Sequence, residues 1–309
     1  MEDKVDTSRA KIIINPVASG GKVGQQWPQI SEVLRQGGLQ FDAELTQAPL
    51  HAIEIARRAL DQGFRHFVAV GGDGTVHEVV NGLVVEGHIP PDVTLSIIPG
   101  GTGSDTIRVM GISRDPLQAC RTALGHQTRT VDIGVMECLR EGKPITRYFV
   151  NVAGLGFDGE VCVRVNRSSK RIGGTLPYLT SLVLTLFAYS NKDVQLTVDG
   201  QPSQGRFNSV VICNGQYFGG GMWVGPKAAP DDGLFDVVLL GDLNKLEFLL
   251  NVPRVYKGTH LTHPKVKSMQ AREVHVQAAQ PMFIQAEGEL VGEAPATFRI
   301  IPGALNLRV

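Results

Sequence analysis

The sequence predicts an α/β domain with a doubly wound parallel sheet, followed by an antiparallel, β-rich, sandwich-like domain. Three observations lead to this fold class. The chain has 309 residues, which exceeds the usual size of one domain. Short apolar runs alternate with helical patterns up to about residue 130, and extended runs separated by glycines dominate after it. We place the domains at residues 1–132 and 133–309. An alternative is that the extreme C-terminus packs with the first domain.

In the first domain, four apolar runs alternate with five helical patterns, which is the order of a doubly wound sheet. The extended runs are 11–14, 41–45, 67–70 and 95–98. The helical patterns are 25–36, 52–60, 76–83, 104–110 and 115–124.

In the second domain, six extended runs favour antiparallel pairing with two inserted helices. The extended runs are 131–137, 148–153, 194–198, 207–212, 235–240 and 273–277, and the helices are expected near 175–189 and 244–256. The segment 175–189 is the most apolar of the chain but is shorter than a membrane-spanning helix needs. It is consistent with a buried helix or with the apolar floor of a lipid site.

The composition argues against a nucleic-acid partner and favours a cytoplasmic location. The chain has 30 basic and 30 acidic residues, so overall electrostatics do not favour nucleic-acid binding. Its four cysteines show no Cys-x-x-Cys spacing, which is typical of reduced thiols. The N-terminus is polar and of mixed charge, without a secretory pattern. We expect a cytoplasmic protein.

Three loops carry the chemistry of the first domain. They read NPVASGGK (15–22), GGDGT (71–75) and PGGTGSD (99–105), and each lies between an extended run and a helical pattern. Loops that follow parallel strands meet at the carboxyl edge of the sheet, where ligands bind. Glycine-rich turns there let backbone N–H groups close on phosphate. None of the loops is a Walker A motif or a complete dinucleotide fingerprint.

Asp73 places a negative charge inside the second loop, between Gly72 and Gly74. A carboxylate beside phosphates is repulsive unless a cation lies between them, and Mg²⁺ bridges carboxylates to phosphates. Asp73 is therefore expected on the magnesium side of the site. Asp105 either faces the same space or, with Ser104, caps the helix that follows.

These loops, with four later motifs, resemble the soluble bacterial diacylglycerol kinase family, whose catalytic domain is shared with sphingosine and ceramide kinases. The later motifs are NVAGLGFDGEV (151–161), VVICNGQYFGGGM (210–222), PKAAPDDGLFDVV (226–238) and AEGEL (286–290). The resemblance covers nearly the whole chain in order. It implies a nucleotide-binding domain like those of NAD kinase and phosphofructokinase, a lipid-binding β-rich domain, and ATP between the two. The implied reaction is the ATP- and Mg²⁺-dependent phosphorylation of a lipid hydroxyl, diacylglycerol to phosphatidic acid foremost.

The resemblance also implies roles for individual residues. Glu289 is the implied proton acceptor. A second, structural magnesium site is implied at Asp232, with oxygens around Ala229 and Leu234. The nucleotide contacts, with Asp105 added as the residue that ends the third loop, are Asn15, Ser19, Gly20, Thr46, Gly72, Asp73, Gly74, Thr75, Val76, His77, Glu78 and Thr102.

Three positions depart from the family pattern. Ser104 stands where the family has asparagine, Glu287 where it has aspartate, and Lys227 where it often has an acidic residue. The longer side chain of Glu287 puts a magnesium-linked or orienting role for that residue in doubt. It leaves the role of Glu289 as base untouched.

A basic run without acidic residues, RVNRSSKR (164–171), contains Arg164, Arg167, Lys170 and Arg171. It is consistent with a solvated loop or with a patch for peripheral docking on an anionic membrane. Two other functions stay open: a small-molecule kinase of the NAD type, and a catalytically silent regulator that binds nucleotide or lipid. A homodimer through an edge strand of the second domain is a further option. The sequence does not choose the lipid among diacylglycerol, a sphingoid base, phosphatidylglycerol and a prenol.

Overall fold

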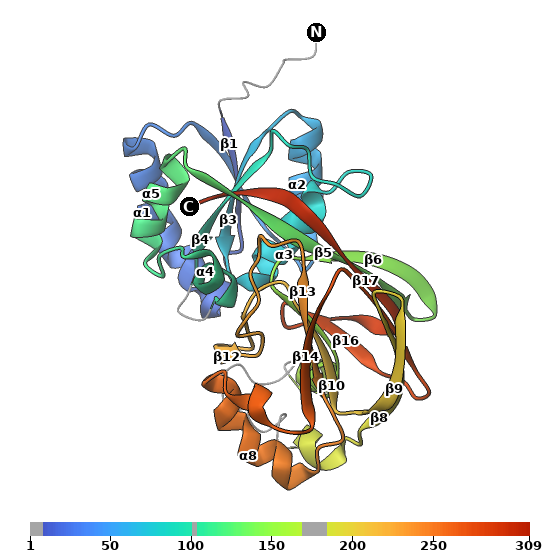
Figure 1. Ribbon diagram of the computed structural model, residues 1–309. Coiled ribbons are helices and arrows are strands. Elements are labelled where there is room, and N and C mark those ends of the chain that lie inside the picture. The colour runs from blue at the N-terminus through green and yellow to red at the C-terminus, as the bar shows by residue number, and fades with distance from the viewer. Residues whose placement is uncertain (1–8, 101–103, 169–183) are drawn as a thin grey trace. The chain divides into compact units, whose positions relative to one another are not determined.

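The computed structural model describes residues 9–100, 104–168 and 184–309, without the side chains of 166–168. The chain divides into two compact units, shown as a ribbon in Figure 1. Unit 1 comprises Met1–Ile133 and Pro302–Val309, and unit 2 comprises Gly134–Ile301. Two long strands, β5 (Thr128–Arg140) and β17 (Glu289–Arg308), each pass from one unit into the other.

Unit 1 is built on parallel strands in the order β2-β1-β3-β4. The end of β17 joins this sheet, since Asn306 and Leu307 pair in parallel with β4. The strands are β1 (Ala10–Ile14), β2 (Phe41–Leu45), β3 (His66–Gly71) and β4 (Thr94–Pro99). The helices are η1 (Ala18–Gly21), α1 (Lys22–Gln36), α2 (His51–Asp61), α3 (Asp73–Leu83), α4 (Asp105–Met110) and α5 (Pro116–Leu124).

Burial explains why the strands of unit 1 read as continuous apolar runs. Every residue of β1 and β3 is buried, because helices cover both faces of a parallel sheet. In unit 1, α1 contacts α5 and α2 contacts α3, and the two pairs lie on opposite sides of the strands (Figure 1). The doubly wound prediction is confirmed.

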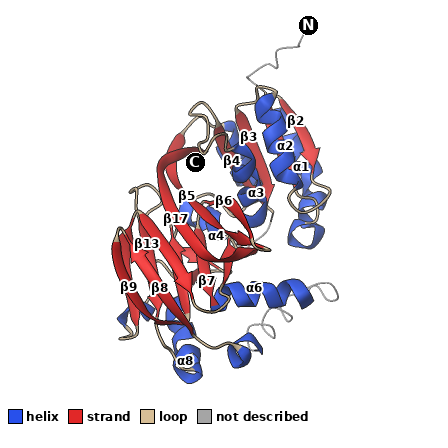
Figure 2. Ribbon diagram, turned by 90° about the vertical axis from the view of Figure 1, so that its right-hand side faces the viewer, coloured by secondary structure: helices blue, strands red, loops and turns tan. Residues whose placement is uncertain are grey.

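Unit 2 is mainly antiparallel, and the strands dominate its view in Figure 2. β7 pairs with β10 and β16, β10 with β13, and β13 with β14, while β8 pairs with β9 and β15. The strands are β6 (Lys143–Phe149), β7 (Val152–Gly156), β8 (Lys192–Val198), β9 (Gln201–Phe207), β10 (Ser209–Cys213), β11 (Tyr217–Phe218), β12 (Met222–Trp223), β13 (Phe235–Leu240), β14 (Val266–Ala271), β15 (Glu273–Ala278) and β16 (Phe283–Ala286). The described helices are α6 (Phe157–Ser168), α8 (Lys245–Tyr256) and η2 (His260–Thr262).

Three phenylalanines centre the core of unit 2. The ring of Phe149 stacks on Phe235 with centroids 5.7 Å apart and meets Phe298 edge-on at 6.4 Å. Gly134 makes room for this cluster, because a Cβ there would lie 2.2 Å from the Phe149 ring. The substitution of Gly134 by any other residue would therefore displace the aromatic cluster.

The structure corrects two expectations for unit 2. The run 148–153 is not one strand, because the chain leaves β6 after Phe149 and enters β7 at Val152. The amides of Val150 and Asn151 between them donate to the side chain of Glu287 instead of to a strand. The start of the basic run is helical and not a loop, since α6 extends to Ser168.

Of the expected helix over 175–189, residues 184–188 are helical and 175–183 lie outside the described residues. The second expected helix is present as α8. Within the described ranges, no helix combines the length and the apolar character needed to cross a bilayer.

Candidate active site

The first glycine-rich loop of unit 1 turns three consecutive residues into left-handed backbone. The φ angles are 54° at Ser19, 69° at Gly20 and 89° at Gly21. A Cβ at Gly20 or Gly21 would meet nothing within 4 Å, so the space beside this backbone is open. Successive N–H groups in such turns form concave sites for anions. The Gly21 amide donates to the Val17 carbonyl at 3.1 Å, so the turn can offer an anion only its remaining amides.

The second loop is tied to the first. Asn15 donates from Nδ2 to Thr75 Oγ1 at 3.2 Å, so these two predicted nucleotide contacts lie together at the ends of β1 and β3. Gly71 is required by this packing, because a Cβ there would lie 2.3 Å from Thr75 Oγ1. Gly72 has open space at the same point, which allows a ligand to approach the backbone at the start of α3.

Asp73 is held by the third loop. Its Oδ1 accepts hydrogen bonds from the Ser104 hydroxyl at 2.5 Å and from the Thr106 amide at 3.0 Å. Its Oδ2 accepts one from the Asp105 amide at 2.9 Å. The carboxylate thus compensates the free amides at the start of α4. The Asp73 carboxylate therefore has hydrogen-bond donors within the protein, and the Ser104 hydroxyl is one of them.

Asp105 is buried at the start of α4, and its Oδ1 lies 3.9 Å from Arg108 Nη1. Ser104, the N-cap residue, does not cap the helix with its own side chain, because its hydroxyl is directed to Asp73. The cap of α4 therefore comes from another loop. Thr102 lies outside the described residues.

Glu78, an implied nucleotide contact, has both carboxylate oxygens engaged inside unit 1. Oε1 accepts from the Leu50 amide at 2.9 Å and Oε2 from the Ala52 amide at 3.1 Å, where α2 begins. Thr46, just before this segment, donates its amide to Ile14 at 2.8 Å. In this arrangement Glu78 holds the segment that follows Thr46.

The remaining implied contacts lie on the first turns of α3. Gly74 is partly exposed, whereas Val76 and His77 are buried. A buried valine side chain belongs to the core, so Val76 can offer a ligand only its backbone.

In unit 2, Glu289 opens β17 directly after a two-residue turn. The turn residues Glu287 and Gly288 have φ angles of 53° and 81°, the left-handed values of a tight hairpin. Glu287 Oε1 accepts from the amides of Val150 at 2.9 Å and Asn151 at 2.6 Å. The side chain of Glu287, whose orienting role the sequence left in doubt, thus fixes the turn beside Glu289.

Two further side chains hold the same turn. Gln285 accepts from the Gly288 amide at 2.9 Å and donates to Asp158 Oδ2 at 3.1 Å. Burial raises the pKa of Asp158 above its ordinary value, and the Gln285 hydrogen bond opposes that rise. The Cys162 thiol donates to the Gly288 carbonyl at 3.4 Å.

Cys162 lies beside the turn that leads into Glu289, since its thiol contacts the carbonyl of the preceding residue, Gly288. Burial raises the pKa of Cys162 to about 12, and the charges of Asp158 and Glu289 add to the rise. Sequence reasoning missed two residues of this region: Asp158, which lies within NVAGLGFDGEV, and Gln285, which directly precedes AEGEL. A polar side chain inside an apolar strand, as in the FIQA of β16, is the signal that could have found Gln285.

The implied metal loop of unit 2 contains a second carboxyl that sequence reasoning missed. Asp232 Oδ1 accepts from the Leu234 amide at 3.0 Å, which closes a small turn. Burial raises the pKa of Asp236 above its ordinary value, the charge of Asp232 adds to this, and Lys227 opposes it. Asp232 follows Ala229 in this loop, and Asp236 lies four residues further on, in β13.

A metal site formed by side chains alone is not present in the described ranges, where no three His, Cys, Asp or Glu residues gather to hold an ion. A carboxylate accepts roughly four hydrogen bonds, and Asp73 uses three of these positions. Because Mg²⁺ keeps several waters and takes its other ligands from phosphates, the remaining position of Asp73 fits such an ion.

The predicted docking residues are only partly described. Arg164 lies on α6, and the backbone of Arg167 belongs to the same helix. Lys170 and Arg171 lie outside the described residues.

Comparison with known proteins identifies relatives of both units. The diacylglycerol kinase catalytic domain matches residues 9–136, and the YegS C-terminal NAD kinase beta sandwich-like domain matches residues 151–309. A diacylglycerol kinase of Bacillus subtilis (strain 168) is 30% identical over 291 residues, covering 94% of this chain and 92% of that protein. One of Staphylococcus carnosus (strain TM300) is 29% identical over 290 residues, covering 94% and 91%.

Among solved structures, a diacylglycerol kinase from Bacillus anthracis str. Sterne superposes with a TM-score of 0.71 at 20% identity. It covers 99% of this chain and 98% of that one. The fold prediction, an α/β domain followed by a β-rich domain, is confirmed.

Proposed function

This chain belongs to the diacylglycerol kinase family, and we propose that it transfers the γ-phosphoryl group of ATP to diacylglycerol, forming phosphatidic acid. Family membership makes the chain a lipid kinase. The choice of diacylglycerol follows the names of the relatives. The choice of ATP follows from the family resemblance, and the glycine-rich loops of unit 1 support a phosphate site.

The observation that carries the nucleotide part is the open backbone of the first two loops. Gly20, Gly21 and Gly72 each leave space where a side chain would otherwise stand, and the first two lie in left-handed backbone. These features let N–H groups approach phosphate oxygens. Asn15 and Thr75, joined by a hydrogen bond, add side-chain groups to the same edge.

A magnesium ion would neutralise charge on the β- and γ-phosphates during transfer. Asp73 is the residue of unit 1 that would hold it, directly through its remaining acceptor position or through a bound water. The three hydrogen bonds from the third loop hold the carboxylate in one position. The loop at Asp232 is proposed as the second, structural magnesium site.

Glu289 is proposed as the general base. The lipid hydroxyl oxygen forms a bond to the γ-phosphorus, and the bond from that phosphorus to the β–γ bridging oxygen breaks. The hydroxyl proton passes to the Glu289 carboxylate, and ADP and the phosphorylated lipid leave. Glu287, Gln285 and Asp158 hold the turn next to this base.

Purified protein incubated with γ-labelled ATP, Mg²⁺ and mixed micelles of single lipids tests the proposal. The micelles carry diacylglycerol, sphingosine, phosphatidylglycerol or a prenol. Label in the lipid extract with diacylglycerol is the expected result. Label found only with another lipid would show that this lipid, and not diacylglycerol, is the phosphoryl acceptor. Label in a water-soluble product would indicate a small-molecule kinase, and ATP binding without transfer would indicate a silent regulator.

Two matched variants test the base. Glu289→Gln keeps the size of the side chain but removes the proton acceptor, so kcat should fall about 10²–10⁴-fold while the ATP Kd stays unchanged. Glu287→Gln should cost less, because its amide oxygen can still accept from the two backbone amides. Glu289→Gln with more than about a tenth of wild-type turnover would show that the base is another residue.

We also propose that the basic run 164–171 contributes to contact with anionic lipid. Replacing Arg167, Lys170 and Arg171 by glutamine should weaken sedimentation with anionic vesicles at low salt. The difference should fade at high salt, which screens surface charge. Equal sedimentation of mutant and wild-type protein at low salt would rule this contribution out.

A further inference from the structure

Helix α8 of unit 2 carries an apolar face that the fold leaves exposed. Leu246, Leu249, Leu250 and Tyr256, which we name the α8 face, are between 44% and 67% exposed. Their spacing of three, four and ten residues from Leu246 places them on one side of the helix. The opposite, inner side of the helix carries Phe248, Val252 and Val255, which are only partly buried. The buried side chain of α8 is that of Asn251.

This exposure is concentrated in one place. In the part of unit 2 that the structure describes, the exposed large hydrophobic side chains are those of the α8 face, Leu184 and Phe187. Lys245 at the start of α8 donates to the Phe187 carbonyl and lies 5.5 Å from the centre of the Phe187 ring. The α8 face and Phe187 are therefore neighbours. Contiguous apolar surface of this kind marks an interaction site.

The charges of α8 that have no ion-pair partner in the described ranges are basic. Lys245 and Arg254 on α8 and Lys257 directly after it are exposed, and within the described ranges none of them pairs with a carboxylate. Glu247 is the acidic residue of the helix, and Lys265 neutralises it at 2.7 Å. An apolar face with a basic rim is complementary to an anionic lipid surface.

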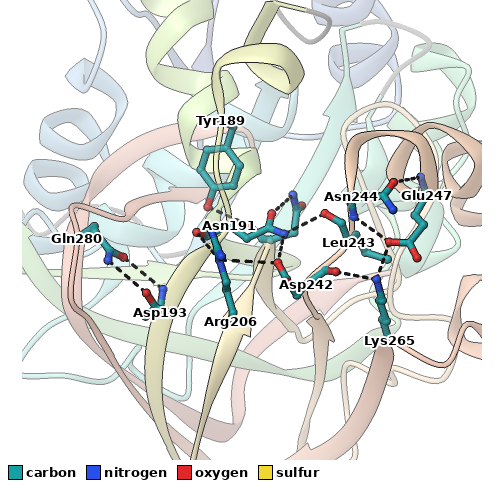
Figure 3. A network of polar contacts seen from close by, with 11 residues as sticks. Tyr189, Asn191, Asp193, Arg206, Asp242, Leu243, Asn244, Glu247, Lys265 and Gln280 are labelled. Carbon is teal, nitrogen blue, oxygen red and sulfur yellow. Dashed lines mark hydrogen bonds and ion pairs between the residues drawn. The ribbon is translucent and has the colours of Figure 1, made fainter.

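A polar network holds the N-terminal end of α8 (Figure 3). Asn244 and Glu247 form a reciprocal capping box at the N-terminus. Lys265 joins Glu247 to the Asp242 carbonyl, and Asn191 donates to the Asp242 carboxylate at 2.7 Å. The helix is thus fixed by its polar end, and not by burial of its leucines.

The inner side of α8 contacts the helix that supports the Glu289 turn. The Phe248 ring lies 4.6 Å from the ring of Phe157, the first residue of α6. One turn further along α6, Cys162 donates to the carbonyl of Gly288. A surface bound to α8 would therefore be linked through α6 to the turn that carries the proposed base.

We propose that the α8 face inserts into the interface of an anionic bilayer and docks unit 2 there. The leucines and Tyr256 enter the headgroup–acyl boundary, and Lys245, Arg254 and Lys257 contact lipid phosphates. A second copy of the chain would bring the same basic rim against itself, and like charges oppose such pairing. The proposal does not depend on the identity of the phosphorylated lipid.

Sedimentation of the full chain with vesicles tests the docking. Vesicles of phosphatidylcholine with phosphatidylglycerol should bind wild-type protein. The triple variant Leu246→Ser, Leu249→Ser, Leu250→Ser should bind at least about tenfold more weakly, which corresponds to about 1.4 kcal/mol. The control variant Leu45→Ser, Val309→Ser alters exposed apolar residues of unit 1 and should bind like wild type.

A second variant separates charge from apolar insertion. Lys245→Gln, Arg254→Gln, Lys257→Gln should lose the preference for vesicles with phosphatidylglycerol over pure phosphatidylcholine. All variants should phosphorylate a water-soluble short-chain diacylglycerol at the wild-type rate. Loss of that activity in every protein, wild type included, would contradict the proposed function but not the docking.

Two results would overturn the docking. One is the absence of wild-type binding to anionic vesicles, or equal binding of the wild type and the leucine variant. The other is a wild-type dimer that the leucine variant converts to a monomer while vesicle binding is unchanged, which would assign the α8 face to a second copy.

Discussion

Replacing Glu287 by alanine removes the acceptor that holds the turn beside Glu289. In the wild type, one carboxylate oxygen accepts two backbone amides, at 2.9 Å from Val150 and 2.6 Å from Asn151. Asn151 is buried, so its amide has no ready replacement by water. We expect Glu287→Ala to destabilise unit 2 and to displace the turn.

The magnitude follows from the two bonds. A hydrogen bond to a charged group contributes about 1.5–3 kcal/mol to the free energy of unfolding. Because two amides share one oxygen and Glu287 is partly exposed, we take a total of about 2–4 kcal/mol. For a unit of this size that lowers Tm by roughly 4–16 °C. Displacement of the turn should reduce kcat by about 10²-fold, since a shift of about 1 Å has effects of that order.

Glu287→Gln is the matched control, because its amide oxygen can accept from the same two amides. Neutral hydrogen bonds are about half as strong as charge-assisted ones, so its loss of stability should be about half that of Glu287→Ala. Scanning calorimetry measures the stability, and turnover of soluble diacylglycerol measures the activity. A Tm for Glu287→Ala equal to the wild-type value, or equal damage from both substitutions, would refute the reasoning from these hydrogen bonds.

Three further predictions concern single residues. Asp73→Ala should nearly abolish phosphoryl transfer and, because it removes three hydrogen bonds, should also lower stability by about 3–6 kcal/mol; full activity with Mg²⁺ would contradict the assignment. Burial lowers the pKa of His66 from 6.5 to about 3, so between these values the unfolded chain binds a proton that the folded chain does not. Stability should therefore fall by up to roughly 1.4 kcal/mol per pH unit as pH drops below 6.5, and His66→Gln should flatten this dependence in a plot of Tm against pH. Asp232→Asn should reduce the rise in Tm that Mg²⁺ gives by binding the folded state, and an equal rise in both proteins would argue against an ion at this loop.

Unit 1 could be predicted from the sequence because its signals are local. Residues 41–45, an extended run in the sequence, are the bounds of β2. Apolar runs such as 67–70 mark strands buried on both faces, and the glycine loops mark their carboxyl ends. The hydrogen-bond donors of Asp73 could not be predicted, because Ser104 and Thr106 lie about 30 residues away in the sequence and contact Asp73 only in the folded unit.

In unit 2 most predicted runs are strands, such as 235–240, which is β13, and the errors lie where distant contacts override local preference. The apolar run 148–153 has strand propensity throughout, but Val150 and Asn151 turn their amides to Glu287, 136–137 residues later. In α6 the valines at 161 and 163 are buried at alternating positions, a pattern that does not by itself indicate a helix. The strand β16 has only four residues, too few for periodicity to predict it, although the polar Gln285 in its apolar run was a signal.

The last residues of unit 1 have a consequence for the order in which the protein folds. Leu305 and Leu307 are buried in unit 1, Gly303 donates its amide to Asp132 at 2.7 Å, and Asn306 and Leu307 pair with β4. Unit 2 is therefore an insertion within unit 1, and the ribosome makes residues 302–309 only after all of unit 2. Until then the β4 edge of the nascent sheet is an unpaired template for other strands. Chaperone protection during synthesis would matter most at that edge, and unit 2 is free to fold before unit 1 is complete.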